Sequence, residues 1–344
     1  MKKPIKLGMV GIGRAGFNMH LKEMAGKEDM FSIVAACDVE AERRETMAEK
    51  FGCKTYYKIE DIVSDPDVEV IDIATRSNDH FVHAKTALEA GKIVFLEKPM
   101  AMTYEEAKKL VEINEKLGGD RLYVRHNRRF EAKFMQVNKI IESGILGKVY
   151  YIKRSVGNFD YRSDWQTLSQ YGGGQLLNWG PHLVDQALCF SGGDYKRMFA
   201  VTKHAVAAGD CEDVVKASFV GINDVNVEIS ISGAEAIRPP EYIVCGTRGE
   251  LIDIDGTNFK IKYISEDFAD PDLVASINTP MGTGFGGKIK PTFVEEERAW
   301  EENPLDHTWT YLYSAVREGK AYPVSCAEAL KVMQTIQDIK DQNK

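Results

Sequence analysis

The stretch Ile5-Lys6-Leu7-Gly8-Met9-Val10-Gly11-Ile12-Gly13-Arg14-Ala15-Gly16 decides the fold of the first part of the chain. Its first six residues form a short apolar run, typical of a buried parallel strand, and lead directly into a G-x-G-x-x-G loop. In such a loop Gly11 permits a tight turn, Gly13 lets a pyrophosphate approach the backbone, and Gly16 lets the next helix pack closely. The helix N-terminus then faces the phosphates. We therefore expect a dinucleotide site formed by Gly11, Gly13, Arg14, Ala15 and Gly16, with a plain glycine turn as the alternative.

The second apolar run, residues 31–37, ends at Asp38, which lies 22 residues after Gly16. A carboxylate at this place holds the hydroxyls of the adenosine ribose and repels a 2′-phosphate. The expected cofactor is therefore NAD rather than NADP. A solvated aspartate is the alternative interpretation.

Strand-like and helix-like segments alternate through the first 124 residues. Apolar runs typical of buried parallel strands cover residues 5–10, 31–37, 70–74, 93–96 and 122–124. Helical patterns cover 79–90, which stops at Gly91, and 103–117, where Thr103 and Glu106 form a capping box. This alternation predicts an α/β Rossmann domain, with a doubly wound parallel sheet, over residues 1–124.

The pattern changes after residue 124, where strands begin to follow one another. Helices are expected near residues 130–143 and 176–190, and two more finish the chain. Strands are expected at 149–156, 197–206, 214–220, 225–232, 242–245 and 251–254. Residues 125–344 are thus predicted to form an α+β domain with a large open, mostly antiparallel sheet, which binds substrate and forms oligomers. Residues 265–300 carry few periodic signals, and we expect a lid or a subunit contact there.

Composition narrows the class of protein. Of the 344 residues, 44% are hydrophobic, which is ordinary for a globular protein. The net charge of −8 and the lack of a lysine and arginine block argue against a nucleic-acid partner, and no apolar run reaches the ~18 residues that span a bilayer. The six cysteines are scattered, without metal-ligand spacing, and no signal-peptide core follows the N-terminus. We expect a reduced, cytoplasmic protein with no metal, nucleic-acid or membrane partner.

Glu97-Lys98-Pro99 directly follows the fifth predicted strand. Ligands bind at the carboxyl ends of strands in doubly wound sheets, so Lys98 is expected in the cofactor crevice, within reach of a reacting hydroxyl. Read by itself, a solvated surface lysine is the more ordinary interpretation.

Four ordered motifs resemble the glucose–fructose oxidoreductase/inositol dehydrogenase (Gfo/Idh/MocA) family over nearly the whole chain. They are the glycine loop, Thr75-x-x-Asn78-x-His80, Glu97-Lys98-Pro99, and residues 172–185 (GGGQLLNWGPHLVD), which are close to the family's G-G-G-x-L-x-D-x-G-x-H-x-x-D. Asn127-Arg128-Arg129-Phe130 and Pro323-Val324-Ser325 also look familial. The resemblance implies a crevice covered by the second domain's sheet, a cis Lys98–Pro99 bond, and a lysine and a histidine that act on a substrate hydroxyl. Cofactor contacts are implied for Thr75, Asn78, His80, Glu97 and Lys98.

His182 and Asp185 are three residues apart, so they share one face of a helix. Taken alone, His182 is more often a satisfied core histidine, but the resemblance makes it the catalytic base, a task that suits imidazole near neutral pH. Asp185 is expected to orient its ring or to contact substrate. Asn178 stands where the family has Asp, and an amide cannot accept a proton, so a relay through this position is in doubt.

The loop before the glycines supplies candidate substrate contacts, because Asn158, Tyr161, Arg162, Asp164 and Trp165 combine hydroxyl-binding groups with a stacking ring. Arg162 and Trp165 are expected to bind substrate together with Lys98, Asn178 and His182. A polar surface loop with a packing tryptophan is the alternative.

A homodimer or homotetramer is also expected. Residues 225, 227, 229 and 231 are all apolar, and an open sheet with such an alternation leaves an apolar face to cover.

Three activities compete at this stage. The first is an NAD-dependent dehydrogenase acting on a secondary hydroxyl of a sugar, cyclitol or glycoside. The second, known among proteins that the chain resembles, is a glycosidase-like enzyme that uses bound NAD for transient oxidation and elimination. The third is a non-catalytic NAD-binding regulator, which the presence of both Lys98 and His182 argues against.

Overall fold

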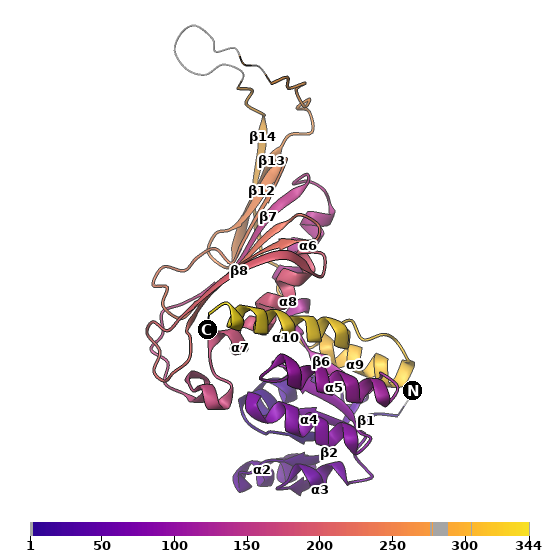
Figure 1. The fold of residues 1–344 in the computed structure, drawn as a ribbon. Coiled ribbons are helices and arrows are strands. Elements are labelled where there is room, and N and C mark those ends of the chain that lie inside the picture. The colour runs from indigo at the N-terminus through magenta and orange to yellow at the C-terminus, as the bar shows by residue number, and fades with distance from the viewer. Residues whose placement is uncertain (1–2, 276, 278–287, 304, 344) are drawn as a thin grey trace.

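A computed structural model describes residues 3–275, 277, 288–303 and 305–343 of the chain. Two sheets dominate it, with helices α8 and α10 between them (Figure 1). The first sheet has six strands in the order β3-β2-β1-β4-β5-β6, and every neighbouring pair is parallel. Its strands are β1 Ile5–Val10, β2 Phe31–Cys37, β3 Lys54–Tyr56, β4 Val70–Ile73, β5 Ile93–Glu97 and β6 Leu122–Arg125. The predicted Rossmann fold is confirmed.

Helices connect the strands of this sheet and cover its faces. They are α1 Leu21–Met24, α2 Ala41–Phe51, α3 Ile59–Val63, α4 His80–Glu89 and α5 Tyr104–Lys116, while the first connection begins as a π-helical segment, Arg14–His20. The predicted capping box is present, since the Glu106 amide donates to Thr103 Oγ1 at 3.2 Å and the Thr103 amide donates to the Glu106 carboxylate. Strand β3 was not predicted, because three residues without an apolar run carry no periodic signal.

The second sheet has eight strands in the order β14-β13-β12-β11-β7-β10-β9-β8. They are β7 Val149–Gly157, β8 Tyr195–Lys203, β9 Val214–Gly221, β10 Asn226–Ser232, β11 Tyr242–Gly246, β12 Gly249–Asp253, β13 Asn258–Ile264 and β14 Phe293–Ala299. Only the β7–β10 pair is parallel, so the predicted open, mostly antiparallel sheet is confirmed. The helices of this half are α6 Ala132–Glu142, α7 Gln175–Asn178, α8 Gly180–Phe190, α9 His307–Glu318 and α10 Cys326–Asp341.

The stretch 265–300 is partly regular, contrary to its irregular pattern in the sequence. Its last part is strand β14, which pairs with β13 along seven residues of each strand. Charge obscured the strand in the sequence: Glu295 on β14 contacts Lys260 and Lys262 of β13 at 2.9 and 3.0 Å. Such cross-strand ion pairs stabilise an edge that apolar periodicity cannot reveal. Residues 276 and 278–287, which belong to the stretch where a lid or a subunit contact is expected, lie outside the described residues.

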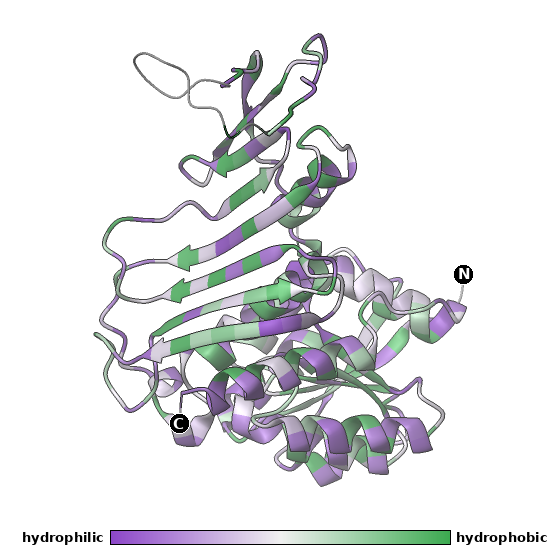
Figure 2. Ribbon diagram, turned by 45° about the horizontal axis from the view of Figure 1, so that its top comes forward, coloured by the Kyte–Doolittle hydropathy of each residue, from purple (hydrophilic) through white to green (hydrophobic). Residues whose placement is uncertain are grey.

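The two faces of the second sheet differ from the expected arrangement. Val227, Ile229 and Ile231 of β10 are almost fully buried in the core shared with α8, so the predicted apolar alternation covers the inner face. The second sheet lies in the foreground of Figure 2, and the strand register places Glu228 of β10, Ser218 of β9 and the exposed Phe199 of β8 on its other face. The expectation that residues 225, 227, 229 and 231 form an outward apolar face is therefore wrong.

The end of the chain returns to the first sheet. Trp309 and Leu312 of α9 are fully buried in the core that also contains Ile5, Leu7 and Phe95. Helix α10 packs against α5 of the first half and α8 of the second. The C-terminal helices therefore brace the two sheets against each other.

Candidate active site

The glycine loop lies at the switch point of the first sheet, where β1 is flanked by β2 on one side and β4 on the other. Gly11 has a φ of +89°, and a Cβ there would lie 2.8 Å from the Ala74 carbonyl. A Cβ on Gly16 would lie 2.1 Å from the oxygen of Gly11. Both positions therefore require glycine, while the space beside Gly13 is open on the side where a pyrophosphate would approach.

Asp38 holds the same loop from the end of β2. Its carboxylate accepts hydrogen bonds from the Ile12 amide at 2.7 Å and the Glu40 amide at 2.9 Å. Arg43 Nη1 lies 3.4 Å from both carboxylate oxygens. The carboxylate is thus fixed where the ribose of a dinucleotide would meet it, with one guanidinium close by.

Thr75, Asn78 and His80 lie at the exit of β4, as predicted, but their side chains mainly contact the protein. His80 is buried, with Nδ1 2.7 Å from the Pro99 carbonyl and Nε2 3.2 Å from the Thr75 carbonyl. Thr75 Oγ1 pairs with His83, and Asn78 Nδ2 donates to Asp79. His80 therefore joins the two strand exits instead of facing the crevice. The predicted cis bond between Lys98 and Pro99 is present.

Glu97 belongs to a buried charge cluster that sequence reasoning missed: Glu23, His20, Asp72, Glu97 and Arg125. His20 Nδ1 lies 2.8 Å from Asp72 and its Nε2 lies 3.0 Å from Glu97, while Arg125 contacts both Glu97 and Glu23. Trp309 Nε1 donates to Glu23 at 2.9 Å. The Glu97 side chain is therefore buried and bound by protein groups. Its two side-chain partners, His20 and Arg125, come from the segment after β1 and from β6, so only the tertiary fold brings them together.

Burial by itself would lower the pKa of His20, but the adjacent Asp72 and Glu97 carboxylates prevail over burial and over the Arg125 charge and raise it to about 9. Burial by itself would raise the pKa of the Glu97 carboxyl, but Arg125, His20 and Lys98 hold this pKa well below its usual value. At neutral pH His20 therefore carries a positive charge and Glu97 a negative charge.

Lys98, Asn178 and His182 meet where the strand end faces the helices of the second half. Lys98 Nζ donates to the backbone carbonyl of Asn178 at 3.1 Å, and the Asn178 side chain accepts from Gln166 Nε2 at 3.4 Å. The His182 ring lies edge-on to Trp179, with centroids 5.9 Å apart, and its Nδ1 is buried without a hydrogen-bond partner in the described chain. The structure thus brings together the three residues that the sequence predicted.

Burial and the surrounding charges lower the pKa values of His182 and Lys98. Burial first, and then the Lys98 and Arg128 charges, hold the pKa of His182 well below its usual value. Burial also lowers the pKa of Lys98, partly offset by Glu97. At neutral pH His182 is a neutral imidazole, which can accept a proton.

Asp185 is directed elsewhere. Both of its carboxylate oxygens contact the Arg129 guanidinium, one of them at 3.0 Å, and Arg129 Nη1 also contacts Glu328 at the start of α10 at 2.6 Å. The expected contact with the His182 ring is therefore replaced by an ion pair that ties α8 to the segment after β6 and to α10.

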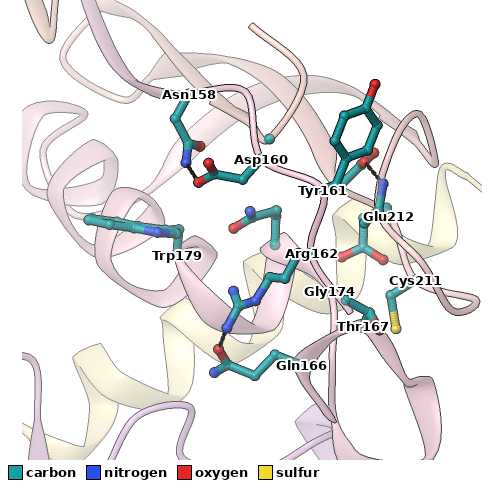
Figure 3. A pocket seen from close by; sticks show the side chains of 14 residues that line it. Asn158, Asp160, Tyr161, Arg162, Gln166, Thr167, Gly174, Trp179, Cys211 and Glu212 are labelled. Carbon is teal, nitrogen blue, oxygen red and sulfur yellow. Dashed lines mark hydrogen bonds between the residues drawn. The ribbon is translucent and has the colours of Figure 1, made fainter. Parts of the chain in front are cut away.

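A pocket of about 380 Å³ opens beside these residues (Figure 3). Its lining includes Asn158, Asp160, Arg162, Glu212 and Trp179, and Arg162 reaches toward Gln166. Trp165 is not among its lining residues, whereas the indole of Trp179 is, and this ring also contacts His182. Trp179 stands within the motif at 172–185, but only the fold shows that its ring forms a pocket wall.

A glycine cradle at the switch point, a carboxylate fixed at the end of β2, and a lysine at the end of β5 that lies near a histidine of α8 are features of a nucleotide-linked oxidoreductase. The family comparisons agree: residues 5–126 match the model described as "Oxidoreductase family, NAD-binding Rossmann fold", and residues 134–252 match the GFO/IDH/MocA C-terminal domain. The chain belongs to the Gfo/Idh/MocA oxidoreductase family.

Individual relatives support this assignment. Inositol 2-dehydrogenase of Salmonella typhimurium is 34% identical over 146 residues, which are 42% of this chain and 43% of that protein. The scyllo-inositol 2-dehydrogenase (NADP(+)) of Bacillus subtilis is 24% identical over 99% of this chain and 94% of its own. The crystal structure of an NAD-binding protein from Listeria innocua superposes with a TM-score of 0.81 at 25% identity, covering 99% of this chain and 95% of that one.

Among the described residues, no group of three or more His, Cys, Asp and Glu side chains is arranged to hold a metal ion. In the same part of the chain, no helix has the length and apolar character needed to cross a membrane.

Proposed function

We propose that the protein is an NAD-dependent dehydrogenase that oxidises a secondary hydroxyl of a sugar, cyclitol or glycoside. The observation that carries this proposal is the meeting of Lys98 and His182 beside a polar pocket, at the carboxyl end of the sheet that carries the glycine cradle. The cradle fits a dinucleotide because Gly11 and Gly16 leave no room for a Cβ and Asp38 is fixed at the ribose position. When bound there, the cofactor supplies a hydride acceptor.

The chain's own residues then handle the proton and the developing charge. His182 is neutral at physiological pH because burial and two cations disfavour its charged form, so it can take the hydroxyl proton. The Lys98 ammonium, held by the Asn178 carbonyl, lies where it can stabilise the alkoxide-like transition state. Asp185 acts through Arg129 to fix the helix that carries His182.

Arg162 and Trp179, which line the pocket, are proposed to hold the substrate ring together with Asn178, whose side chain contacts the lining residue Gln166. Inositols, sugars and glycosides should be assayed with NAD and NADP by nicotinamide absorbance. Failure of every polyol to reduce either cofactor, with a folded protein, would contradict the proposal.

The NAD preference rests on Asp38. Asp38→Ser should shift the ratio of NAD to NADP affinity toward NADP by about tenfold or more, because like-charge repulsion at an interface costs several kcal/mol and Arg43 becomes free to meet a 2′-phosphate. Calorimetric affinities of the native and variant proteins for both cofactors measure this. Tighter binding of NADP than NAD by the native protein would overturn the preference, and the NADP-linked Bacillus subtilis relative makes this a sharp test.

One observation favours a second candidate, the glycosidase-like reaction. Glu212 lines the pocket, and burial raises the pKa of its carboxyl, so it suits protonation of a leaving group. Release of an aglycone from a glycoside without net NADH formation would support the glycosidase-like reaction over simple dehydrogenation.

A homodimer or homotetramer that covers the outer face of the second sheet is also proposed, with Phe199 as an exposed apolar contact on that face. A monomeric mass by light scattering at micromolar concentration would refute it.

A further inference from the structure

His126 is a buried histidine that neither the motifs nor the proposed reaction uses. Glu97 and Arg125 are the last paired residues of the parallel strands β5 and β6. The residues that follow them, Lys98 and His126, therefore leave the sheet side by side at its carboxyl edge. Only 2% of His126 is exposed, and its Nδ1 has no hydrogen-bond partner among the described residues. A buried polar atom of this kind needs an explanation, and function is one of the common ones.

The segment after His126 connects it to the helix of His182. Residues Asn127–Phe130 form a 3-10 turn whose Arg129 pairs with Asp185 and whose Arg128 carbonyl accepts from Gln186 Nε2 at 2.9 Å. His126 therefore lies between the Lys98 strand end and α8. The charges that act on the pKa of His126 are those of Lys98 and Glu97 at the end of β5, Arg129 in the 3-10 turn and Asp185 of α8, and His126 in turn acts on the pKa of His182.

The two histidines differ in their electrostatic surroundings. Beyond burial, His182 faces the cations Lys98 and Arg128 against the single carboxylate of Glu97, so an imidazolium there is poorly stabilised. Burial also lowers the pKa of His126, and the charges of Arg129 and Lys98 act in the same direction. The carboxylates of Asp185 and Glu97 act in the opposite direction and raise it. A proton taken up by His182 is therefore better accommodated on His126.

We propose that His126 receives the substrate proton from His182 during alcohol oxidation; this rests on the proposed dehydrogenase function. The substrate O–H bond breaks as the His182 Nε2–H bond forms. The proton on His182 Nδ1 then passes, directly or through one water, to His126 Nδ1, and His126 releases it to solvent after product leaves. The two electrons of the broken C–H bond leave with the hydride, so the balance needs no further reactant. His126 thereby supplies the relay that the amide of Asn178 cannot.

The kinetic test compares His126→Asn and His126→Phe with the native enzyme on whichever polyol of the panel is oxidised. Turnover should fall by about 10- to 100-fold, less than for loss of the base itself, while KM for NAD and polyol stays near native. The acid limb of the pH profile, which reports His126 in its neutral form, should move, and added imidazole should restore turnover in the Asn variant. His307→Asn is the matched control, because this partly buried histidine of α9 bonds to Asn303 and stacks on Tyr311, and its loss should leave turnover and the pH profile unchanged.

A second readout needs no turnover. Histidine ring titration by NMR in the cofactor-free protein should show the pKa of His182 rising in His126→Asn, because the neighbouring imidazole charge is removed. An unchanged His182 titration overturns the relay, as does a native pH profile in an active His126→Asn enzyme. A raised KM without imidazole rescue in both variants also overturns it, since that result means a structural role. If no polyol is oxidised, the dehydrogenase proposal fails by itself, and the NMR experiment still decides whether the two histidines are coupled.

Discussion

The buried charge cluster beneath Lys98 and the pocket loop, residues 158–166, border the same site but are built in opposite ways. In the cluster, His20, Asp72 and Arg125 are essentially inaccessible, and their charges are paired across strands. In the pocket loop, Arg162 and Asp164 pair at 3.0 Å with side-chain exposures of 32% and 51%. Buried charges are costly to unpair, whereas exposed pairs exchange partners with little cost. The comparison indicates that the charged support beneath Lys98 is rigid, while the side chains of the pocket loop can change partners.

The largest expected effect comes from removing the base. His182→Ala should lower turnover by about 10²–10⁴-fold, because proton transfer from the hydroxyl loses its acceptor. NAD affinity should stay near native, since the cradle and Asp38 are untouched. Steady-state kinetics and calorimetric binding measure the two quantities. Near-native turnover in this variant would show that His182 is not the base.

The buried charge cluster should make the free energy of unfolding depend on pH. The pKa of His20 is about 9 in the folded protein and near 6.5 when unfolded, so its contribution is fully present below about pH 6.5 and is lost as pH rises through about 9. The native free energy of unfolding should therefore decline over that window. His20→Asn should flatten the decline and reduce stability near pH 6.5 by about 3–5 kcal/mol, because a buried ion pair is broken.

Urea unfolding at several pH values measures this decline, and Arg162→Ala is the control, since an exposed pair contributes only about 0.2–1 kcal/mol. An equal decline with pH in the native and His20→Asn proteins would contradict the assigned pairing.

Arg162→Ala tests the adaptable side of the comparison. We expect KM for the polyol to rise by about tenfold, because one hydrogen bond to the substrate is lost, while kcat stays within about twofold of native. Lys196→Ala, which removes another exposed ion pair at a distant site, is the matched control and should leave KM unchanged. A fall in kcat at constant KM would place Arg162 among the reacting groups.

The smallest effect should follow Asn178→Ala. Lys98 is held by the backbone carbonyl of residue 178, which any residue provides, and the lost side-chain contact to Gln166 is long at 3.4 Å. Turnover should fall by less than about fivefold, far less than in His182→Ala, because one neutral hydrogen bond contributes about 1 kcal/mol. If Asn178→Ala is the more damaging of the two changes, the assigned roles are wrong.

The sequence by itself determined the local features of this protein. A glycine loop after an apolar strand, a capping box at Thr103 and a lysine at a strand end are each encoded within a few residues, and all were predicted correctly. Motif resemblance added His182 and the cis Lys98–Pro99 bond. These features depend on backbone conformation and short-range chemistry, which a linear pattern records.

Only the tertiary structure decided which distant residues share an environment. His20, Asp72, Glu97 and Arg125 come from four separate elements, Asp185 pairs with Arg129 instead of His182, and Val227, Ile229 and Ile231 face inward. The charged edge strand β14 became visible through its pairing with β13. In each case the physical reason is that burial and charge pairing depend on neighbours brought together by sheet register and helix packing, which no local periodicity contains.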